Sequence, residues 1–263
     1  MSTMKLIAID MDGTLLNDRK EIPESFFPVM QELQKQGVQF VIASGRQYAT
    51  LASLFKGHDE HFIYICENGA AVFQEGKPLF LDQADPLVMK YIVKDLRKFG
   101  KVNPVICGAH GAYIEKGSRD VIEHVEQYYK SYQIVNDLLD IIENQPICKM
   151  SILDLHDAEH HVYPYMKKYS DIFQILLSGY EWVDVMNVGV NKGEAYTRLM
   201  KRLGYTSDQC MAFGDYLNDI ELLQSCKYSY AMENAHPDVK QAANFIAPSN
   251  EEAGVVQILK TML

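Results

Sequence analysis

The chain has 263 residues, of which 48% are hydrophobic and 23% are charged, as is typical of a soluble globular protein. Its formal net charge of −10 argues against non-specific binding to nucleic acids, which needs a basic surface. The five cysteines are odd in number and widely spaced, so they suggest neither a zinc site nor a disulfide framework. No apolar stretch approaches the ~20 residues of a membrane span, and the N-terminus lacks a signal-peptide pattern. We therefore expect a cytoplasmic protein without a membrane partner.

The first 81 residues alternate between strand and helix patterns. The expected elements are strands at 5–10, 39–44 and 62–66, helices at 25–36 and 46–56, and a hairpin at 70–81. Short apolar runs bounded by turn signals are typical of buried strands in a parallel sheet. Strands that alternate with helices indicate right-handed crossover connections.

From residue 82 the pattern changes to a mixture of hairpins and helices. The expected helices are at 86–99, 119–130, 136–143 and 157–169, and the expected strands at 104–115, 149–155 and 173–186. The alternating pattern then returns, with helices at 192–203, 218–226, 237–243 and 251–262 and strands at 210–214, 228–232 and 244–247. We predict an α/β fold with a discontinuous, Rossmann-like parallel-sheet core domain at 1–81 and 188–263. An α+β domain at 82–187 is inserted into it.

Polar residues stand where the predicted strands end or helices begin. Asp10 and Asp12 follow the first strand, Ser-Gly-Arg at 44–46 follows the second, and Gly-Asp-Tyr-Leu-Asn-Asp occupies 214–219. Lys192 opens a helix. In a parallel sheet these ends converge on one edge. Carboxylates in this number suit a hard cation such as Mg²⁺, and a hydroxyl, backbone amides and a lysine suit phosphate oxygens.

Each of these motifs alone also fits a purely structural role. Ser44-Gly45 fits a helix N-cap, Lys192 a solvated helix start, and Gly214-Asp215 a turn. Several such coincidences in this order are less common than one shared site. The stretch HDAEHH at 156–161 does not match the HExxH metal motif, and we expect a solvated helix start there.

Four motifs resemble, in order, those of the haloacid dehalogenase (HAD) superfamily: DMDGT at 10–14, SGR at 44–46, NKG at 191–193 and GDYLND at 214–219. ENGA at 67–70 and AMENA at 231–235 resemble further signatures of its Cof-type phosphatases, subfamily IIB. In that group a large α+β cap lies between the second and third motifs. The resemblance covers the whole chain and implies a HAD core domain with a cap at 82–187 that selects the substrate.

Position by position, the resemblance implies roles for the motif residues. Asp10 matches the nucleophile and Asp12 the general acid and base. The positions that match Mg²⁺ ligands are Asp10, the backbone carbonyl of Asp12, and Asp215, with Asp219 behind them or as an occasional ligand. The positions that match the phosphoryl-binding residues are Ser44, Gly45, Lys192 and Asn218, with Arg46 beside them. The role of Glu67 stays open.

The implied function is a Mg²⁺-dependent phosphatase that hydrolyses small phosphorylated metabolites through an aspartyl-phosphate. The stretches ASGRQY and ENGA favour sugar phosphates, while nucleotides and phosphorylated cofactors stay open. The alternatives are a phosphomutase on the same scaffold or a non-catalytic sensor of a phosphorylated metabolite. A signalling receiver domain fits less well, because its phosphoacceptor lies on a middle strand. The expected partner is a small phosphate monoester, and the expected assembly is a monomer or a homodimer.

Overall fold

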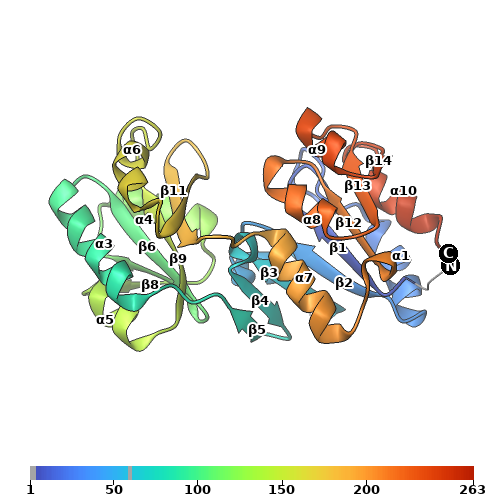
Figure 1. Ribbon diagram of the computed structural model, residues 1–263, viewed down its shortest axis with the longest axis horizontal. Helices are drawn as coiled ribbons and strands as arrows, with labels where there is room; N and C mark the ends of the chain where they lie inside the picture. The colour runs from blue at the N-terminus through green and yellow to red at the C-terminus, as the bar shows by residue number, and fades with distance from the viewer. Residues whose placement is uncertain (1–3, 59–60) are drawn as a thin grey trace. The chain divides into compact units, whose positions relative to one another are not determined.

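The computed structural model describes residues 4–58 and 61–263. The chain divides into two compact units, and each has its own sheet (Figure 1). The first unit consists of Met1–Gly45, Phe55–Lys77 and Asn191–Leu263. The second consists of Arg46–Leu54 and Pro78–Val190. The assignment of 82–187 as a functional cap stays a prediction.

The strands of the first unit belong to an eight-stranded sheet with the order β14-β13-β12-β1-β2-β3-β4-β5, whose last strand continues from Lys77 into residues that group with the second unit. Its strands are β1 (Leu6–Asp10), β2 (Gln39–Ala43), β3 (Phe62–Cys66), β4 (Ala71–Gln74), β5 (Lys77–Leu81), β12 (Cys210–Gly214), β13 (Tyr228–Met232) and β14 (Phe245–Ala247). The six strands from β14 to β3 pair in parallel, and β4 pairs with β3 in antiparallel fashion. The predicted α/β fold with a parallel sheet is therefore confirmed.

Helices with an apolar stripe pack onto this sheet. They are α1 (Phe26–Lys35), α7 (Lys192–Leu203), α8 (Ile220–Gln224), α9 (Pro237–Ala242) and α10 (Gly254–Lys260). In α1 the residues at helical spacing, Phe26, Val29, Met30 and Leu33, are buried. The five residues of β1 are all buried as well, as expected for a central strand covered on both faces.

Strand register brings the carboxyl ends of the central strands to one edge of the sheet. Asp10 at the end of β1 pairs with Ala43 at the end of β2. On the other side of β1, Ile9 pairs with Phe213, one residue before β12 ends at Gly214. The segments that follow these three strands therefore leave the sheet next to one another.

The second unit contains a six-stranded sheet with the order β10-β11-β9-β6-β7-β8. Its strands are β6 (Asn103–Gly108), β7 (Gly111–Glu115), β8 (Tyr132–Val135), β9 (Ile147–Leu153), β10 (Phe173–Leu177) and β11 (Trp182–Asn187). Its helices are α2 (Tyr48–Leu54), α3 (Pro86–Phe99), α4 (Arg119–Tyr128), α5 (Leu138–Asn144) and α6 (Val162–Met166). Most strand pairs are antiparallel, and β7–β8 is parallel.

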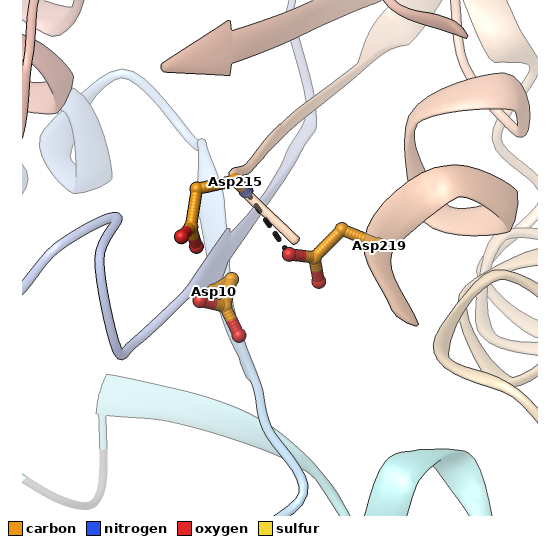
Figure 2. Close-up of side chains that lie close together, drawn as sticks. All are labelled: Asp10, Asp215 and Asp219. Atoms are coloured by element: carbon orange, nitrogen blue, oxygen red, sulfur yellow. Dashed lines mark hydrogen bonds between the residues drawn. The ribbon is translucent and has the colours of Figure 1, made fainter. Parts of the chain in front are cut away.

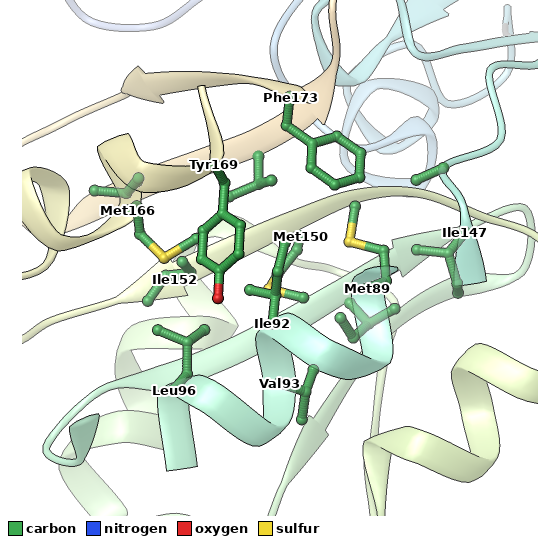
Figure 3. Packing of buried hydrophobic residues seen from close by; sticks show 14 of the residues in the cluster. Met89, Ile92, Val93, Leu96, Ile147, Met150, Ile152, Met166, Tyr169 and Phe173 are labelled. Carbon is green, nitrogen blue, oxygen red and sulfur yellow. The ribbon is translucent and has the colours of Figure 1, made fainter. Parts of the chain in front are cut away.

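Period-two alternation in these strands produces two apolar clusters. Ile106, Met150 and Ile152 pack in a cluster with residues of α3, α5 and α6, part of which is shown in Figure 3. Val105 and Leu153, their neighbours in sequence, belong to a separate cluster with residues of α4. Both faces of this sheet are therefore covered by helices.

Side chains of the segment 46–54 tie it to the rest of the second unit. Gln47 donates from Nε2 to the carbonyl of Ser131 (2.9 Å) and accepts from the backbone N–H of Ser131 (3.1 Å). The Thr50 hydroxyl donates to the carbonyl of Tyr128 (3.1 Å). These bonds explain why α2 groups with residues far along the chain.

The second unit differs from the expected elements most clearly at β8 and α6. Strand β8 (Tyr132–Val135) was not predicted, and helix α6 begins at Val162 instead of residue 157. Before α6, the Asp154 carboxylate accepts from the N–H of His156 (3.1 Å) and the Asp157 carboxylate from that of His160 (3.0 Å). Such local side-chain bonds compete with helix formation.

All five cysteines are free and buried, as expected for small core residues. Across the described parts of the chain, 4–58 and 61–263, no helix combines the length and the apolar character that crossing a membrane requires.

Candidate active site

The end of β1 places the Asp10 carboxylate at the edge of the sheet, next to the loop after β12. Asp10 is the last residue of β1 and is only 6% exposed. Gly13 follows with a φ of +81°, and a Cβ atom there would lie 2.3 Å from Oδ2 of Asp215. The Thr14 hydroxyl donates to Oδ1 of Asp215 (2.9 Å). The turn 10–14 and the loop after β12 therefore pack directly against each other, which only glycine at 13 allows.

Lys192 links two of the aspartates. Its Nζ donates to Oδ1 of Asp10 (2.6 Å) and to Oδ1 of Asp219 (2.7 Å), and its side chain is 1% exposed. The neighbouring Gly193 allows α7 to approach α8, because a Cβ atom there would lie 2.3 Å from the Glu221 backbone. The start of α7 thus carries a buried ammonium group to the end of β1.

The loop after β12 folds around the Asp219 carboxylate. Oδ2 of Asp219 accepts from the backbone N–H of Asp215 (3.1 Å), as Figure 2 shows, and from that of Tyr216 (3.2 Å). A Cβ atom at Gly214 would lie 2.5 Å from Cβ of Asp219. Asp219 is fully buried and holds this loop in place.

The crowding of charges shifts several pKa values in this cluster. Burial, together with the charge of Asp219, raises the pKa of Asp10 well above its ordinary value, and Lys192 opposes this rise. Burial also raises the pKa of Asp215 from 3.8 to about 6. Burial alone would lower the pKa of Lys192, but the charges of Asp10 and Asp219 outweigh it and raise that pKa. The site is therefore an anionic cluster that one buried ammonium only partly neutralises.

The donor set fits a divalent cation. Asp10, Asp215 and Asp219 each offer a carboxylate oxygen, and these oxygens lie within 4.8 Å of one another (Figure 2). Oxygen ligands of this kind suit a hard cation, and the excess negative charge would be offset by one. An acidic cluster that could hold a metal ion is thus present at the predicted edge of the sheet. Among residues 4–58 and 61–263 no comparable group includes a histidine of the HDAEHH stretch.

Predicted phosphoryl-binding residues gather around Asn68. The carbonyl of Ser44 accepts from the N–H of Asn68 (3.1 Å), and a Cβ atom at Gly45 would lie 3.0 Å from Oδ1 of Asn68. The same Oδ1 accepts from Nδ2 of Asn218 (3.1 Å). Ser44, Gly45 and Asn218 therefore lie close together in the first unit, whereas Arg46 belongs to the second unit.

Sequence reasoning gave no role to Asn68 or Thr14. Asn68 has a φ of +54°, and the next residue, Gly69, has a φ of +102° and packs against the carbonyl of Asn191. Asparagine and glycine are the residues that most readily adopt such left-handed conformations. The sequence Asn-Gly inside ENGA is the signal that could have identified this bend. The role of the buried Glu67 stays open.

Comparison with known proteins gives consistent matches over the whole chain. A family model described as haloacid dehalogenase-like hydrolase matches residues 7–259. YbjI of Escherichia coli, a 5-amino-6-(5-phospho-D-ribitylamino)uracil phosphatase, is 34% identical over 99% of this chain and 97% of its own. A solved structure from Eubacterium rectale is 28% identical, with a TM-score of 0.90 over 99% of each chain. A sugar phosphatase of HAD subclass IIB shares the fold, with 21% identity and a TM-score of 0.80 over 99% of this chain and 100% of its own.

Proposed function

Because the chain belongs to the haloacid dehalogenase-like hydrolases, we propose that it is a Mg²⁺-dependent phosphatase that forms an aspartyl-phosphate on Asp10. Its family and its enzyme class, a phosphoric monoester hydrolase, are those that the motifs predicted. The observation that carries the proposal is the buried contact of Lys192 Nζ with Asp10 and Asp219, at 2.6 and 2.7 Å.

In the first step Asp10 acts as the nucleophile. One of its carboxylate oxygens attacks phosphorus, the bond from phosphorus to the ester oxygen breaks, and Asp12 gives its proton to that oxygen. Lys192 favours the ionised form of Asp10 and attracts the phosphoryl oxygens. The product alcohol leaves, and Asp12 is then a carboxylate.

In the second step water hydrolyses the aspartyl-phosphate. Asp12 takes a proton from the water while the water oxygen attacks phosphorus, and the bond to the Asp10 oxygen breaks. Inorganic phosphate is released, Asp10 is again a carboxylate, and Asp12 again carries a proton.

The proposed Mg²⁺ ligands are Asp10, Asp215 and the backbone carbonyl of Asp12. When bound, Mg²⁺ supplies positive charge that offsets the charge on the phosphoryl oxygens. We propose that Asp219 does not bind Mg²⁺ directly and instead supports these ligands, because its oxygens already accept hydrogen bonds from Lys192 and from two backbone N–H groups.

The segments around Asn68 are proposed to hold the phosphoryl group. Ser44 would offer its hydroxyl, Gly45 its backbone amide and Asn218 its side-chain amide. Arg46 stays a proposed neighbour of this group. The inserted residues 82–187 are proposed to select the substrate, because the polar groups proposed for the first unit are assigned to the phosphoryl group and few are left to recognise the alcohol.

We propose a sugar or sugar-alcohol phosphate as the substrate class. The sequence stretches ASGRQY and ENGA favour sugar phosphates, and YbjI, the relative at 34% identity, is named for a phosphorylated ribityl compound. The two sequence stretches and the name of YbjI both indicate a phosphate ester of a polyhydroxylated chain. The compound named for YbjI is therefore the first one to test, beside nucleotides and phosphorylated cofactors.

The test is a screen for release of inorganic phosphate from these compounds, with Mg²⁺ and with a chelator. We expect turnover only with Mg²⁺, no turnover by Asp10→Asn, and unchanged turnover by Asp171→Asn, an exposed carboxylate in the second unit. Conversion of a sugar phosphate into its isomer without phosphate release would indicate a phosphomutase instead. Binding without any turnover would indicate a sensor.

A further inference from the structure

The side chain of Lys20 contacts the carboxylate of Asp12. Its Nζ donates to Oδ1 of Asp12 at 3.0 Å, with 61% of the Lys20 side chain and 39% of the Asp12 side chain exposed. Ion pairs exposed to this degree add little to stability. The contact therefore matters for the position of the Asp12 carboxylate and not for the stability of the protein.

The Asp12 carboxylate lies outside the acidic cluster. Among the residues that the structure describes, the oxygens gathered within 4.8 Å of one another come from Asp10, Asp215 and Asp219. Asp12 is two residues after Asp10 and could turn toward a cation bound there. The contact with Lys20 gives its carboxylate a partner outside that cluster.

The backbone at Lys20 is held in an unfavourable conformation. Lys20 has a φ of +64°, a left-handed value that is costly for a residue with a Cβ atom. The N–H of Lys20 donates to the carbonyl of Asn17 (2.8 Å), and the N–H of Glu21 donates to the Asn17 side chain (2.9 Å). Strained residues persist where the surroundings over-determine them, most often at functional sites.

The turn that carries Lys20 is also anchored from outside. Asn250 donates from Nδ2 to the carbonyl of Leu16 (3.0 Å) and to Oδ1 of Asp18 (3.2 Å). The N–H of Asp18 donates to the Glu251 carboxylate (2.6 Å). These bonds hold the backbone of the turn that carries Lys20. The Lys20 ammonium group can therefore hold the Asp12 carboxylate by the hydrogen bond to its Oδ1.

We propose that Lys20 is a positioning residue that holds the Asp12 carboxylate away from the metal-binding cluster, where it transfers protons. This inference rests on the proposed phosphatase function. It predicts that removing Lys20 impairs the step that needs Asp12 as a base, the hydrolysis of the aspartyl-phosphate. The attack by Asp10 on an ester with a good leaving group needs Asp12 least and is impaired least.

The test is rapid mixing of p-nitrophenyl phosphate with the Mg²⁺-loaded full chain. For Lys20→Ala we expect a burst of about one equivalent of p-nitrophenolate, then steady turnover reduced roughly 10- to 100-fold. This is less than the ~10²–10⁴-fold worth of acid–base help, because Asp12 itself is still present. Lys20→Arg should restore turnover to within a few-fold. Arg19→Ala, in the same turn and paired with Glu21 at 3.1 Å, should match the wild type.

Lys20→Gly separates the charge from the backbone strain. Glycine adopts a positive φ without penalty, so this variant should melt no earlier than Lys20→Ala and still lose the same turnover. The loss should also vanish in an Asp12→Ala background, because a residue that acts through Asp12 has nothing left to position.

Three results would overturn the inference. Wild-type kinetics in both Lys20→Ala and Lys20→Gly would show that the contact between Lys20 and Asp12 does not contribute to turnover. A raised KM and an equal loss in the Asp12→Ala background would show that Lys20 binds the substrate directly. Absence of both burst and turnover in the wild type would instead overturn the proposed function and the inference with it.

Discussion

Replacing Asp215 by asparagine should stabilise the metal-free protein at neutral pH. Asp215 lies beside Asp10 and Asp219 in a half-buried position, and burial raises its pKa from 3.8 to about 6. The native state therefore binds the proton more tightly than the unfolded chain. Stability falls as the pH rises from 3.8 to about 6, and above that range the charged form carries the full penalty.

The expected gain follows from this difference. A rise of about two pKa units corresponds to ~3 kcal/mol at ~1.36 kcal/mol per unit. Solvent screening of a half-buried group reduces this to ~1–2 kcal/mol. An asparagine oxygen can still accept from the Thr14 hydroxyl, which now donates to Oδ1 of Asp215 at 2.9 Å, so no buried donor is left unpaired.

Urea denaturation in a chelator, followed by circular dichroism, measures the gain. Circular dichroism follows the whole chain, whereas the single tryptophan, Trp182, belongs to the second unit. Asp215→Asn should be more stable than the wild type at pH 7–8 and equal to it near pH 3–4, while Asp171→Asn should match the wild type throughout. With Mg²⁺ at about 100 times its Kd, the wild type should gain ~2.7 kcal/mol, and the variant should gain far less. A variant that is less stable at neutral pH, or equally stabilised at both pH values, would refute this account of the cluster.

Three further results are expected. Ca²⁺ should inhibit turnover, because it takes more oxygen ligands at longer distances and would draw the attacking oxygen of Asp10 onto the metal; equal turnover with both ions would count against this role of Asp10. Asp10→Asn should form no phosphoenzyme, whereas Asp12→Ala should give a burst of phenolate and then hydrolyse ~10²–10⁴-fold more slowly; a reversed pattern would exchange the two roles. Asp85→Ala should lower the free energy of unfolding by ~1 kcal/mol without changing turnover, because the Asp85 carboxylate caps α3 by accepting from Leu87 N–H (2.8 Å) and Val88 N–H (3.2 Å); an unchanged urea midpoint would mean that water replaces this cap.

The sequence predicted the core sheet because its strands are strongly apolar and its turns carry clear signals. The run before Asp10 is buried on both faces, and such a run is hard to place anywhere except in a central strand. Strand β8 lacked this signal, because it lies at a sheet edge and two of its four residues are exposed. The start of α6 was missed for a different reason: Asp154 and Asp157 bond to nearby backbone N–H groups in place of a first helical turn.

In the candidate site as well, some contacts could be predicted from the sequence and others could not. Asp10, Lys192 and Asp219 could be grouped from the sequence, because strand ends in a parallel sheet converge and opposite charges attract. The contact of Lys20 could not, because it depends on a positive φ value at a position where the residue type does not favour one, whereas the Asn-Gly pair at 68–69 was a signal that was overlooked. A lysine in a polar turn gives no sequence signal that its backbone is left-handed.

The polypeptide crosses between the two units four times, after Gly45, Leu54, Lys77 and Val190. The last two crossings bracket the long inserted segment. The first two bracket the short segment 46–54, which contains α2 and belongs to the second unit. Its Gln47 and Thr50 form hydrogen bonds with residues 128–131. A deletion of residues 82–187 alone would therefore strip α2 of its hydrogen-bond partners and leave new polar surface next in sequence to Ser44 and Gly45. Domain dissection of this protein should replace Gln47–Leu54 with a short linker as well, so that the isolated first unit keeps the residues 44–46 that follow β2.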